Sequence, residues 1–255
     1  SGTWQQIGSK IEGENRFDNS EHSVSLSSDG SIVAIGAYGN DANGNSSGHV
    51  RIYQNNSGTW QQVGSDIDGE AAWDESGYSV SLSADGSIVA IGARKNNGNG
   101  DDSGHVRIYQ NNSGTWQQIG SDINGEAASD YSGYSVSLSA DGSIVAIGAP
   151  YNDDTANASG HVRIYQNNSG TWQQVGSDID GEAADDESGY SVSLSDDGSI
   201  VAIGAWKNDG NGIASGHVRV YKIDLVAPTV SAVTSSTSDG TYTVGDVINI
   251  AVAFS

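Results

Sequence analysis

The sequence predicts an all-β protein, a four-bladed β-propeller built from a repeat of 56 residues. The string SGTWQQ occurs four times, with tryptophans at positions 4, 60, 116 and 172, so that successive copies are 56 residues apart. Each period contains four short runs of alternating apolar and polar residues, separated by turn residues, and no helical periodicity. Four antiparallel strands in a repeat of this length are typical of a propeller blade.

The second copy illustrates the four strands of one repeat. The predicted strands are Tyr78–Ser83, Ser87–Ala93, His105–Gln110 and Thr115–Ile123. An Asp-Gly pair separates the first two strands, and such a pair favours the two-residue turn of an antiparallel hairpin. The same pair interrupts every copy, which predicts one hairpin of this type in each blade.

The two ends of the repeat region complement each other. Residues 1–11 contain only a fourth strand, whereas the last copy contains the first three strands and departs from the pattern at Lys222. The sequence therefore predicts a propeller over residues 1–224, in which the N-terminal strand completes the last blade and removes an open sheet edge. The alternative is an eight-bladed ring of two chains, each completing the other's last blade.

Residues 225–255 differ in composition from the repeats. They contain two strand-like runs, Thr229–Ser235 and Val247–Phe254. Two strands do not bury the core of a sandwich by themselves. This segment is therefore interpreted either as part of a larger domain or as a tail that donates a strand to another chain.

The repeat resembles a known family. The pattern GYSVSLS-x-DG-SIVAIGAP…SGHVRIYQ, clearest at Gly133–Gln166, is similar to the FG-GAP repeat of integrin-alpha-type propellers, and the resemblance covers residues 1–224. It implies a propeller fold and leaves the ligand open. The integrin-type repeat carries a calcium loop of the form DxNxDGxxD, but the loops of this chain are shorter and of the SADGS type. That calcium site is therefore not transferred to Asp29, Asp85, Asp141 or Asp197.

The tail after Pro228 is similar to immunoglobulin-like modules of large bacterial surface proteins. This resemblance implies an adhesin-type parent protein, secreted or at the cell surface.

Composition argues against several classes of function. The net charge is −22, from 32 acidic and 10 basic residues, which disfavours binding to nucleic acid or an anionic membrane. There is no cysteine for disulfides or thiolate metal sites, and no apolar run long enough to insert into a membrane. The sequence contains no Gly-x-Ser-x-Gly, HExxH or phosphate-loop motif, so we expect no enzymatic activity.

The loops between the second and third strands differ most among the copies. Loops on a rigid scaffold commonly carry recognition, which makes this face the candidate binding face. Its aromatic and basic side chains suit a carbohydrate or a protein ligand. The candidate ligand-binding residues are Tyr38, Trp73, Arg94, Lys95, Tyr151, Trp206 and Lys207. Neutral variation of exposed loops is the competing interpretation.

The acidic linkers between blades form a second candidate site. Two of them read SDIDGEAAWDE and SDIDGEAADDE, with carboxylates at alternate positions, and such oxygens suit calcium. The candidate calcium ligands are Asp66, Asp68, Glu70, Asp178, Asp180 and Glu182. The spacing is only half of a complete calcium loop, and Lys10 replaces the leading aspartate in the first copy. A solvated Asp-Gly turn is therefore the competing interpretation.

A histidine begins the third strand of every copy. Third strands lie far from the axis of a propeller, so four such imidazoles do not reach one shared ion. The sequence predicts a structural role for them, hydrogen-bonded at a strand end together with an arginine two residues further on. The histidines are His49, His105, His161 and His217.

These features predict an extracellular, non-enzymatic module for adhesion or recognition. The alternative is a structural subunit of an extracellular filament, in which residues 225–255 associate with another copy by donor-strand pairing.

Overall fold

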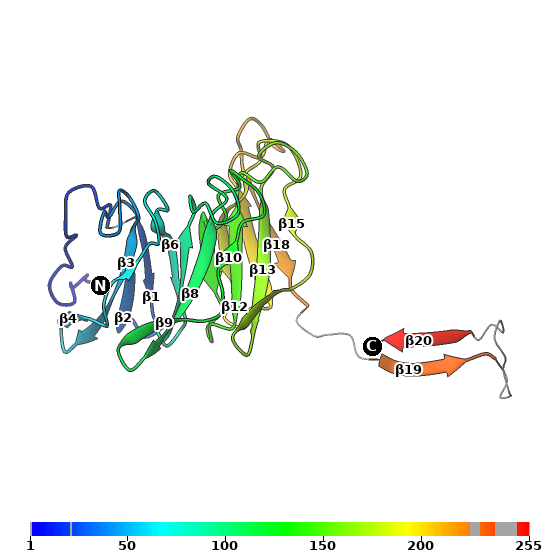
Figure 1. The fold of residues 1–255 in the computed structure, drawn as a ribbon, viewed down its shortest axis with the longest axis horizontal. Helices are drawn as coiled ribbons and strands as arrows, with labels where there is room; N and C mark the ends of the chain where they lie inside the picture. Colours follow the sequence, from blue (N-terminus) through cyan, green and yellow to red (C-terminus); the bar gives the residue numbers. More distant parts are fainter. Residues whose placement is uncertain (1, 21, 225–229, 238–248, 255) are drawn as a thin grey trace. The chain divides into compact units, whose positions relative to one another are not determined.

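The computed structural model describes residues 2–20, 22–224, 230–237 and 249–254 (Figure 1). The chain divides into two compact units, Ser1–Ile223 and Asp224–Ser255. The regular elements are β-strands, which confirms the predicted all-β class. The described part of the chain contains no helix long and apolar enough to cross a membrane.

The first unit consists of four antiparallel sheets, the blades, that follow one another in chain order (Figure 1). Blade one contains β1 (Ser23–Leu26), β2 (Ile32–Ala37), β3 (His49–Asn56), β4 (Thr59–Gln62) and β5 (Ile67–Asp68). Blade two contains β6 (Ser76–Leu82), β7 (Ile88–Ala93), β8 (His105–Asn112), β9 (Thr115–Gln118) and β10 (Ile123–Asn124). Blade three contains β11 (Ser135–Leu138), β12 (Ile144–Ala149), β13 (His161–Asn168), β14 (Thr171–Gln174) and β15 (Ile179–Asp180). Blade four contains β16 (Ser188–Leu194), β17 (Ile200–Ala205) and β18 (His217–Lys222).

The outer strand of each of the first three blades is divided in two. In blade two, β9 pairs with the end of β8, where Asn112 faces Thr115, and β10 pairs with its beginning, where His105 faces Asn124. Gly120 lies between them with a φ of 73°, which breaks the extended backbone. The continuous strand predicted over residues 115–123 is therefore wrong in its middle part.

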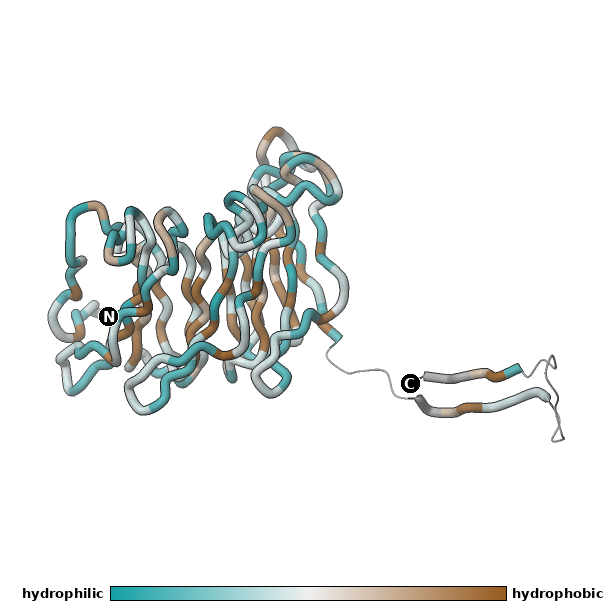
Figure 2. The backbone as a smooth tube through the Cα atoms, viewed as in Figure 1, coloured by the Kyte–Doolittle hydropathy of each residue, from teal (hydrophilic) through white to brown (hydrophobic). Residues whose placement is uncertain are grey.

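Buried apolar side chains lie between neighbouring blades. Val50 and Ile52 of blade one pack against Leu82 and Ile91 of blade two, and the equivalent residues pack between blades two and three. Figure 2 shows apolar residues along the strands and polar residues along the loops. Stability in such an array is largely a sum of interface contributions.

Serine hydroxyls also connect the blades. The backbone N–H groups of Val80 and Leu82 in β6 donate to Ser23 Oγ and Ser25 Oγ of β1, both at 2.9 Å. The same contact recurs between later blades. Because β6 is the innermost strand of its sheet, these hydroxyls satisfy donors on a sheet edge.

The N-terminal segment does not follow the predicted path. Residues 2–11 contain no strand, and the sheet of blade four has three strands. The carbonyl of Ile7 instead accepts a hydrogen bond from Trp60 Nε1 of blade one at 3.0 Å. This contact repeats the one between Trp116 and the Val63 carbonyl one blade later, so it holds the segment beside blade one. The closing strand predicted for residues 1–11 therefore does not form in this structure.

The second unit contains β19 (Val230–Ser235) and β20 (Ile250–Phe254), which pair antiparallel. These strands lie within the two predicted runs, and residues 229 and 247–248 of those runs lie outside the described residues.

Candidate functional site

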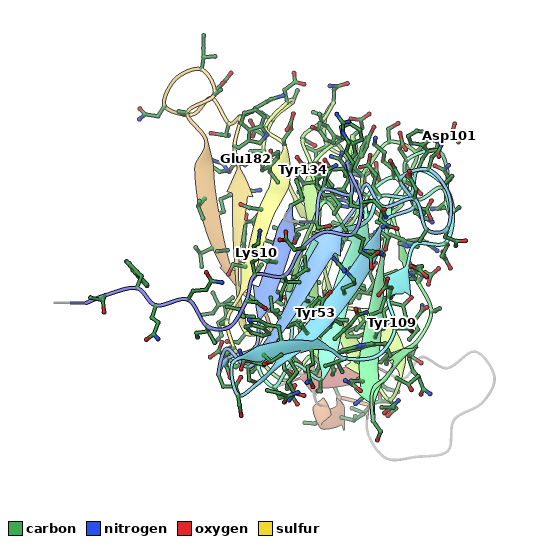
Figure 3. All side chains as sticks on the ribbon, turned by 90° about the vertical axis from the view of Figure 1, so that its left-hand side faces the viewer. Lys10, Tyr53, Asp101, Tyr109, Tyr134 and Glu182 are labelled. Carbon is green, nitrogen blue, oxygen red and sulfur yellow. The ribbon has the colours of Figure 1, made fainter. Side chains whose placement is uncertain are left out.

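The loop face carries a ladder of aromatic rings at the start of the innermost strands. Ring centroids of Tyr78 and Tyr134 are 5.0 Å apart, and those of Tyr134 and Tyr190 are 4.9 Å apart. Figure 3 shows Tyr134 at the end of the blades where the long loops gather. Burial, followed by hydrogen bonds with Tyr190 and Tyr78, raises the pKa of Tyr134. Tyr134 is therefore uncharged at neutral pH, and the ladder links three blades.

One predicted cation, Arg94, lies against this ladder, and a second, Lys95, binds the same carboxylate as Arg94. The guanidinium of Arg94 lies over Tyr78, and its Nε donates to Glu75 Oε2 at 2.7 Å. Lys95 Nζ lies 2.7 Å from the other oxygen of Glu75. Glu75 is buried, and its φ of 56° places it in the left-handed region that non-glycine residues rarely adopt. One buried carboxylate thus positions both cations of blade two.

Blade four repeats this arrangement with one replacement. Lys207 pairs with the buried Glu187, and Trp206 takes the place of Arg94, donates to Glu187 and lies 5.3 Å from Tyr190. In blade one, Tyr38 packs against His22 and Tyr78 of the ladder. Three of the predicted residues therefore contact the ladder, Tyr38, Arg94 and Trp206, and Lys207 lies beside Trp206.

A depression of about 450 Å³ opens between the loops of blades two and three. It brings together Arg94, Lys95 and Tyr151, which are three of the seven predicted ligand-binding residues. Its lining also includes Ser129, Tyr131, Asp153, Asn157 and Ala158. The rings of Tyr131 and Tyr151 meet edge-on at 5.2 Å. The other predicted residues, including the exposed Trp73 with its φ of 72°, do not line it.

The structure separates the predicted calcium ligands of each linker. Asp66 faces His49 of blade one, with Oδ2 3.6 Å from Nδ1, whereas Glu70 faces Arg107 and His105 of blade two. The carbonyl of Asp68 accepts a hydrogen bond from Arg107. The other predicted linker divides in the same way: Asp178 faces His161, Glu182 faces Arg219, and the carbonyl of Asp180 accepts from Arg219.

Each buried histidine instead meets carboxylates from two different linkers. Around His105, Asp122 Oδ2 lies 3.8 Å and Glu70 Oε2 4.0 Å from Nδ1. Around His161, Asp178 Oδ2 lies 3.7 Å and Glu126 Oε2 3.8 Å from Nδ1. The predicted position of these histidines at a strand end is confirmed, and they are buried there. The predicted hydrogen bonding is wrong at Nδ1, which has no hydrogen-bond partner within the described part of the chain. Their carboxylate partners were not predicted, because those partners come from separate copies of the repeat.

Burial is the largest cause of the pKa shifts in these clusters. It lowers the pKa of His105 to about 4, helped by the charge of Arg107 and opposed by Asp122. Burial likewise lowers the pKa of His161, with Arg163 acting in the same direction. Burial also raises the pKa of Glu126; Arg163 opposes this shift and Asp178 adds to it. At neutral pH these two imidazoles are therefore neutral.

Comparison with known proteins assigns the repeat. A family model described as the FG-GAP repeat matches residues 124–165 and 178–221, which correspond to blades three and four. Two of the four repeats therefore match the FG-GAP repeat. No curated protein matches the chain. Among solved structures, hydrazine synthase from Kuenenia stuttgartiensis aligns over 89% of this chain and 56% of its own, with 10% sequence identity and a TM-score of 0.49.

Comparison of the four copies of the repeat would have located Tyr131, the residue of the depression that the sequence analysis missed. Tyr131 stands 56 residues after Glu75 and 56 before Glu187, so it is the aromatic replacement of a buried acid. Blades two and four thus carry an acid with its cation, and blade three carries a tyrosine. The depression therefore brings together the cations of blade two and the tyrosines of blade three.

Proposed function

We propose that this chain is an extracellular, non-enzymatic recognition module that binds carbohydrate on the loop face of its FG-GAP blades. The observation that supports this most strongly is the meeting of Arg94 and Lys95 with Tyr131 and Tyr151 around one depression. Its volume of about 450 Å³ lies within the usual range of small-ligand sites. The similarity of the tail to bacterial surface modules supports a secreted or cell-surface location.

The charges favour a neutral sugar over an acidic ligand. Glu75 already neutralises part of the charge of Arg94 and Lys95, and the chain as a whole carries a charge of −22. An anion approaching this surface meets net repulsion. Tyrosine rings offer apolar contact to a sugar ring, and the side chains of Asp153 and Asn157 offer hydrogen bonds to hydroxyl groups.

Binding without hydrolysis fits the lining. Glycosidases commonly use a pair of carboxyl groups on either side of the scissile bond. Among the described lining residues the carboxyl group is that of Asp153. We therefore assign the depression to recognition.

A glycan array followed by calorimetry with the best-bound neutral oligosaccharide tests this proposal. We expect Y151A and Y131A to weaken binding about tenfold or more, a loss of about 1.4 kcal/mol or more. W206A is the matched control, because Trp206 lies in the equivalent loop of blade four and does not line the depression. Unchanged affinity in Y151A, or an equal loss in W206A, would reject the site.

A second candidate function, a subunit of a structural assembly, is favoured by the two end blades. Val218 of β18 is 68% exposed, whereas its counterparts Val50, Val106 and Val162 are 0% exposed. At the other end Val24 of β1 is 62% exposed, whereas its counterpart Val80 is 7% exposed. Each end therefore presents a surface that another blade covers elsewhere in the same chain, and a second copy joined head to tail would cover both.

Sedimentation velocity of V24D, V218D and their equimolar mixture tests this second candidate. The wild type should self-associate and each variant alone should be monomeric. The mixture should form a dimer, because V24D keeps an intact fourth blade and V218D an intact first blade. A monomeric wild type would reject the assembly. Self-association that survives both changes and is lost on truncation after Asp224 would support joining by residues 225–255 instead.

A further inference from the structure

Three clusters of the same composition lie where a linker reaches the third strand of a blade. In each, one ligand atom of a buried histidine and one oxygen each of an aspartate and a glutamate lie within 4.8 Å of one another. The clusters are His49 with Glu14 and Asp66, His105 with Glu70 and Asp122, and His161 with Glu126, Asp178 and Asp154. We propose that each cluster binds one divalent transition-metal ion, with zinc as the representative ion.

The free oxygen of each aspartate is directed at the histidine by a neighbouring glutamine. Gln118 Nε2 donates to Asp122 Oδ1 at 2.7 Å, so that Oδ2 is the oxygen nearest His105 Nδ1. The equivalent glutamines, Gln62 and Gln174, donate in the same way to Asp66 and Asp178. Hydrogen bonds of this kind to the second oxygen orient carboxylate ligands in metal sites.

An arginine fixes each glutamate in the same manner. Arg107 Nη1 lies 3.4 Å from Glu70 Oε1, and Glu70 Oε2 is the oxygen that faces His105. Arg163 holds Glu126 at the same distance. In the clusters of His105 and His161, the aspartate, the arginine-bound glutamate and the imidazole therefore each direct one free atom towards a common point.

The histidine nitrogens are the second, independent observation. Nδ1 of His49, His105 and His161 is buried and has no hydrogen-bond partner within the described part of the chain. The side chains themselves are at most 1% exposed. A buried polar atom without a hydrogen-bond partner destabilises the folded state, and here such an atom recurs in three blades. An ion bound at Nδ1 would remove this cost.

Donor type and spacing favour zinc over calcium. Zinc binds nitrogen and oxygen at about 2.0–2.2 Å, which sets tetrahedral donors ~3.4 Å apart. The nearest oxygens of Asp66, Glu70, Asp122, Glu126 and Asp178 lie 3.6 to 4.0 Å from the histidine Nδ1, and the donors of each cluster all lie within 4.8 Å of one another, so small movements of partly exposed carboxylates close the site. Calcium takes six to eight oxygens and disfavours imidazole. The cluster of blade three has Asp154 as a fourth donor, so it should bind most tightly.

The fourth blade provides an internal control. His217 faces Glu182 at 3.7 Å, but the linker that would supply an aspartate is absent after β18. In the first copy, Lys10 stands 56 residues before Asp66, at the aspartate position. The proposal therefore predicts three ions per chain and none at His217.

Equilibrium dialysis of the full chain against Zn²⁺ after chelator treatment, with zinc counted by mass spectrometry, tests the proposal. We expect three zinc ions per wild-type chain, two in each of D66N, D122N and D178N, and none in the triple variant. E182Q, which changes the fourth blade, should still bind three. The melting temperature should rise with zinc in the wild type, should not rise in the triple variant, and should not respond to calcium.

Circular dichroism in chelator checks that each variant is folded. Where an asparagine variant is unfolded, the lysine variant D122K or D178K replaces it, because lysine occupies this position naturally in the first copy. A wild-type chain that binds no zinc overturns the proposal. A zinc count that does not fall by one in each single variant, or that survives in the triple variant, also overturns it.

Discussion

The guanidinium carbon of Arg94 lies 3.7 Å from the centroid of the Tyr78 ring. The same guanidinium lies 5.5 Å from Tyr134, the next ring of the ladder, and is hydrogen-bonded to the buried Glu75. Arg94 therefore joins a loop of the candidate binding face to the rings that connect blades two and three.

We expect R94A to lower the free energy of unfolding by about 2 kcal/mol. The substitution removes a cation–π contact and leaves Glu75 with Lys95 as its remaining cation, and buried carboxylates that lose a partner are costly. Urea denaturation measures the change. R16A is the matched control, since Arg16 lies over Phe17 on an exposed loop, and it should change stability by less than about 0.5 kcal/mol. Equal effects of the two changes would contradict this account.

The tryptophans of the repeat offer a second comparison. Trp116 Nε1 donates to the Val63 carbonyl at 2.8 Å, whereas Trp4 is fully exposed. W116F should destabilise the protein by about 1 kcal/mol, because the hydrogen bond between blades is lost. W4F should have no effect in thermal or chemical denaturation. Destabilisation by W4F would show that the N-terminal segment closes a ring in solution.

Two equivalent glycines test how closely the blades approach. A Cβ on Gly92 would lie 2.1 Å from the carbonyl oxygen of Gly133 in the next blade, so G92A forces the backbones of blades two and three apart. We expect a loss of roughly 3 kcal/mol. A Cβ on Gly204 meets only the flexible hydroxyl of Ser191, at 2.5 Å, so G204A should cost less than about 1 kcal/mol. Similar losses of unfolding free energy for both variants would exclude the close interface as the cause.

The Asp-Gly hairpins predict a dependence of stability on acid. Ser195 Oγ donates to Asp197 at 2.7 Å, and hydrogen bonds from the Ser199 backbone and hydroxyl join it. Together they lower the pKa of Asp197 from 3.8 to about 2. Because the folded pKa is the lower one, this carboxylate stabilises the fold above pH 3.8 and loses that effect as the pH falls towards 2.

The variant D197N tests the direction of this pH dependence of stability. At neutral pH the variant should melt below the wild type, and the difference should shrink as the pH falls from about 4 to about 2. Melting temperatures recorded across this range by circular dichroism give the comparison. A constant difference at every pH would show that the carboxylate charge has no role.

The sequence could place the loop face and the cations on it, but only part of the site. Arg94, Lys95 and Tyr151 were predicted because they vary among otherwise similar loops. Whether they meet depends on the arrangement of the loops in space, which brings Arg94, Lys95 and Tyr151 together around the depression and places Trp206 on Glu187 of its own blade. The same limit applies to the linkers, because carboxylates adjacent in sequence point to different blades.

The sequence by itself determined the all-β class, the 56-residue blade and its hairpins, because strand alternation and Asp-Gly turns act over a few residues. Tertiary structure alone decided three other features: the break in the outer strand at Gly120, the position of Ile7 beside Trp60, and the grouping of His105 with Glu70 and Asp122. Each of these depends on contacts between segments far apart in the chain. Such contacts arise from the stacking of one blade on the next, and a single repeat does not encode them.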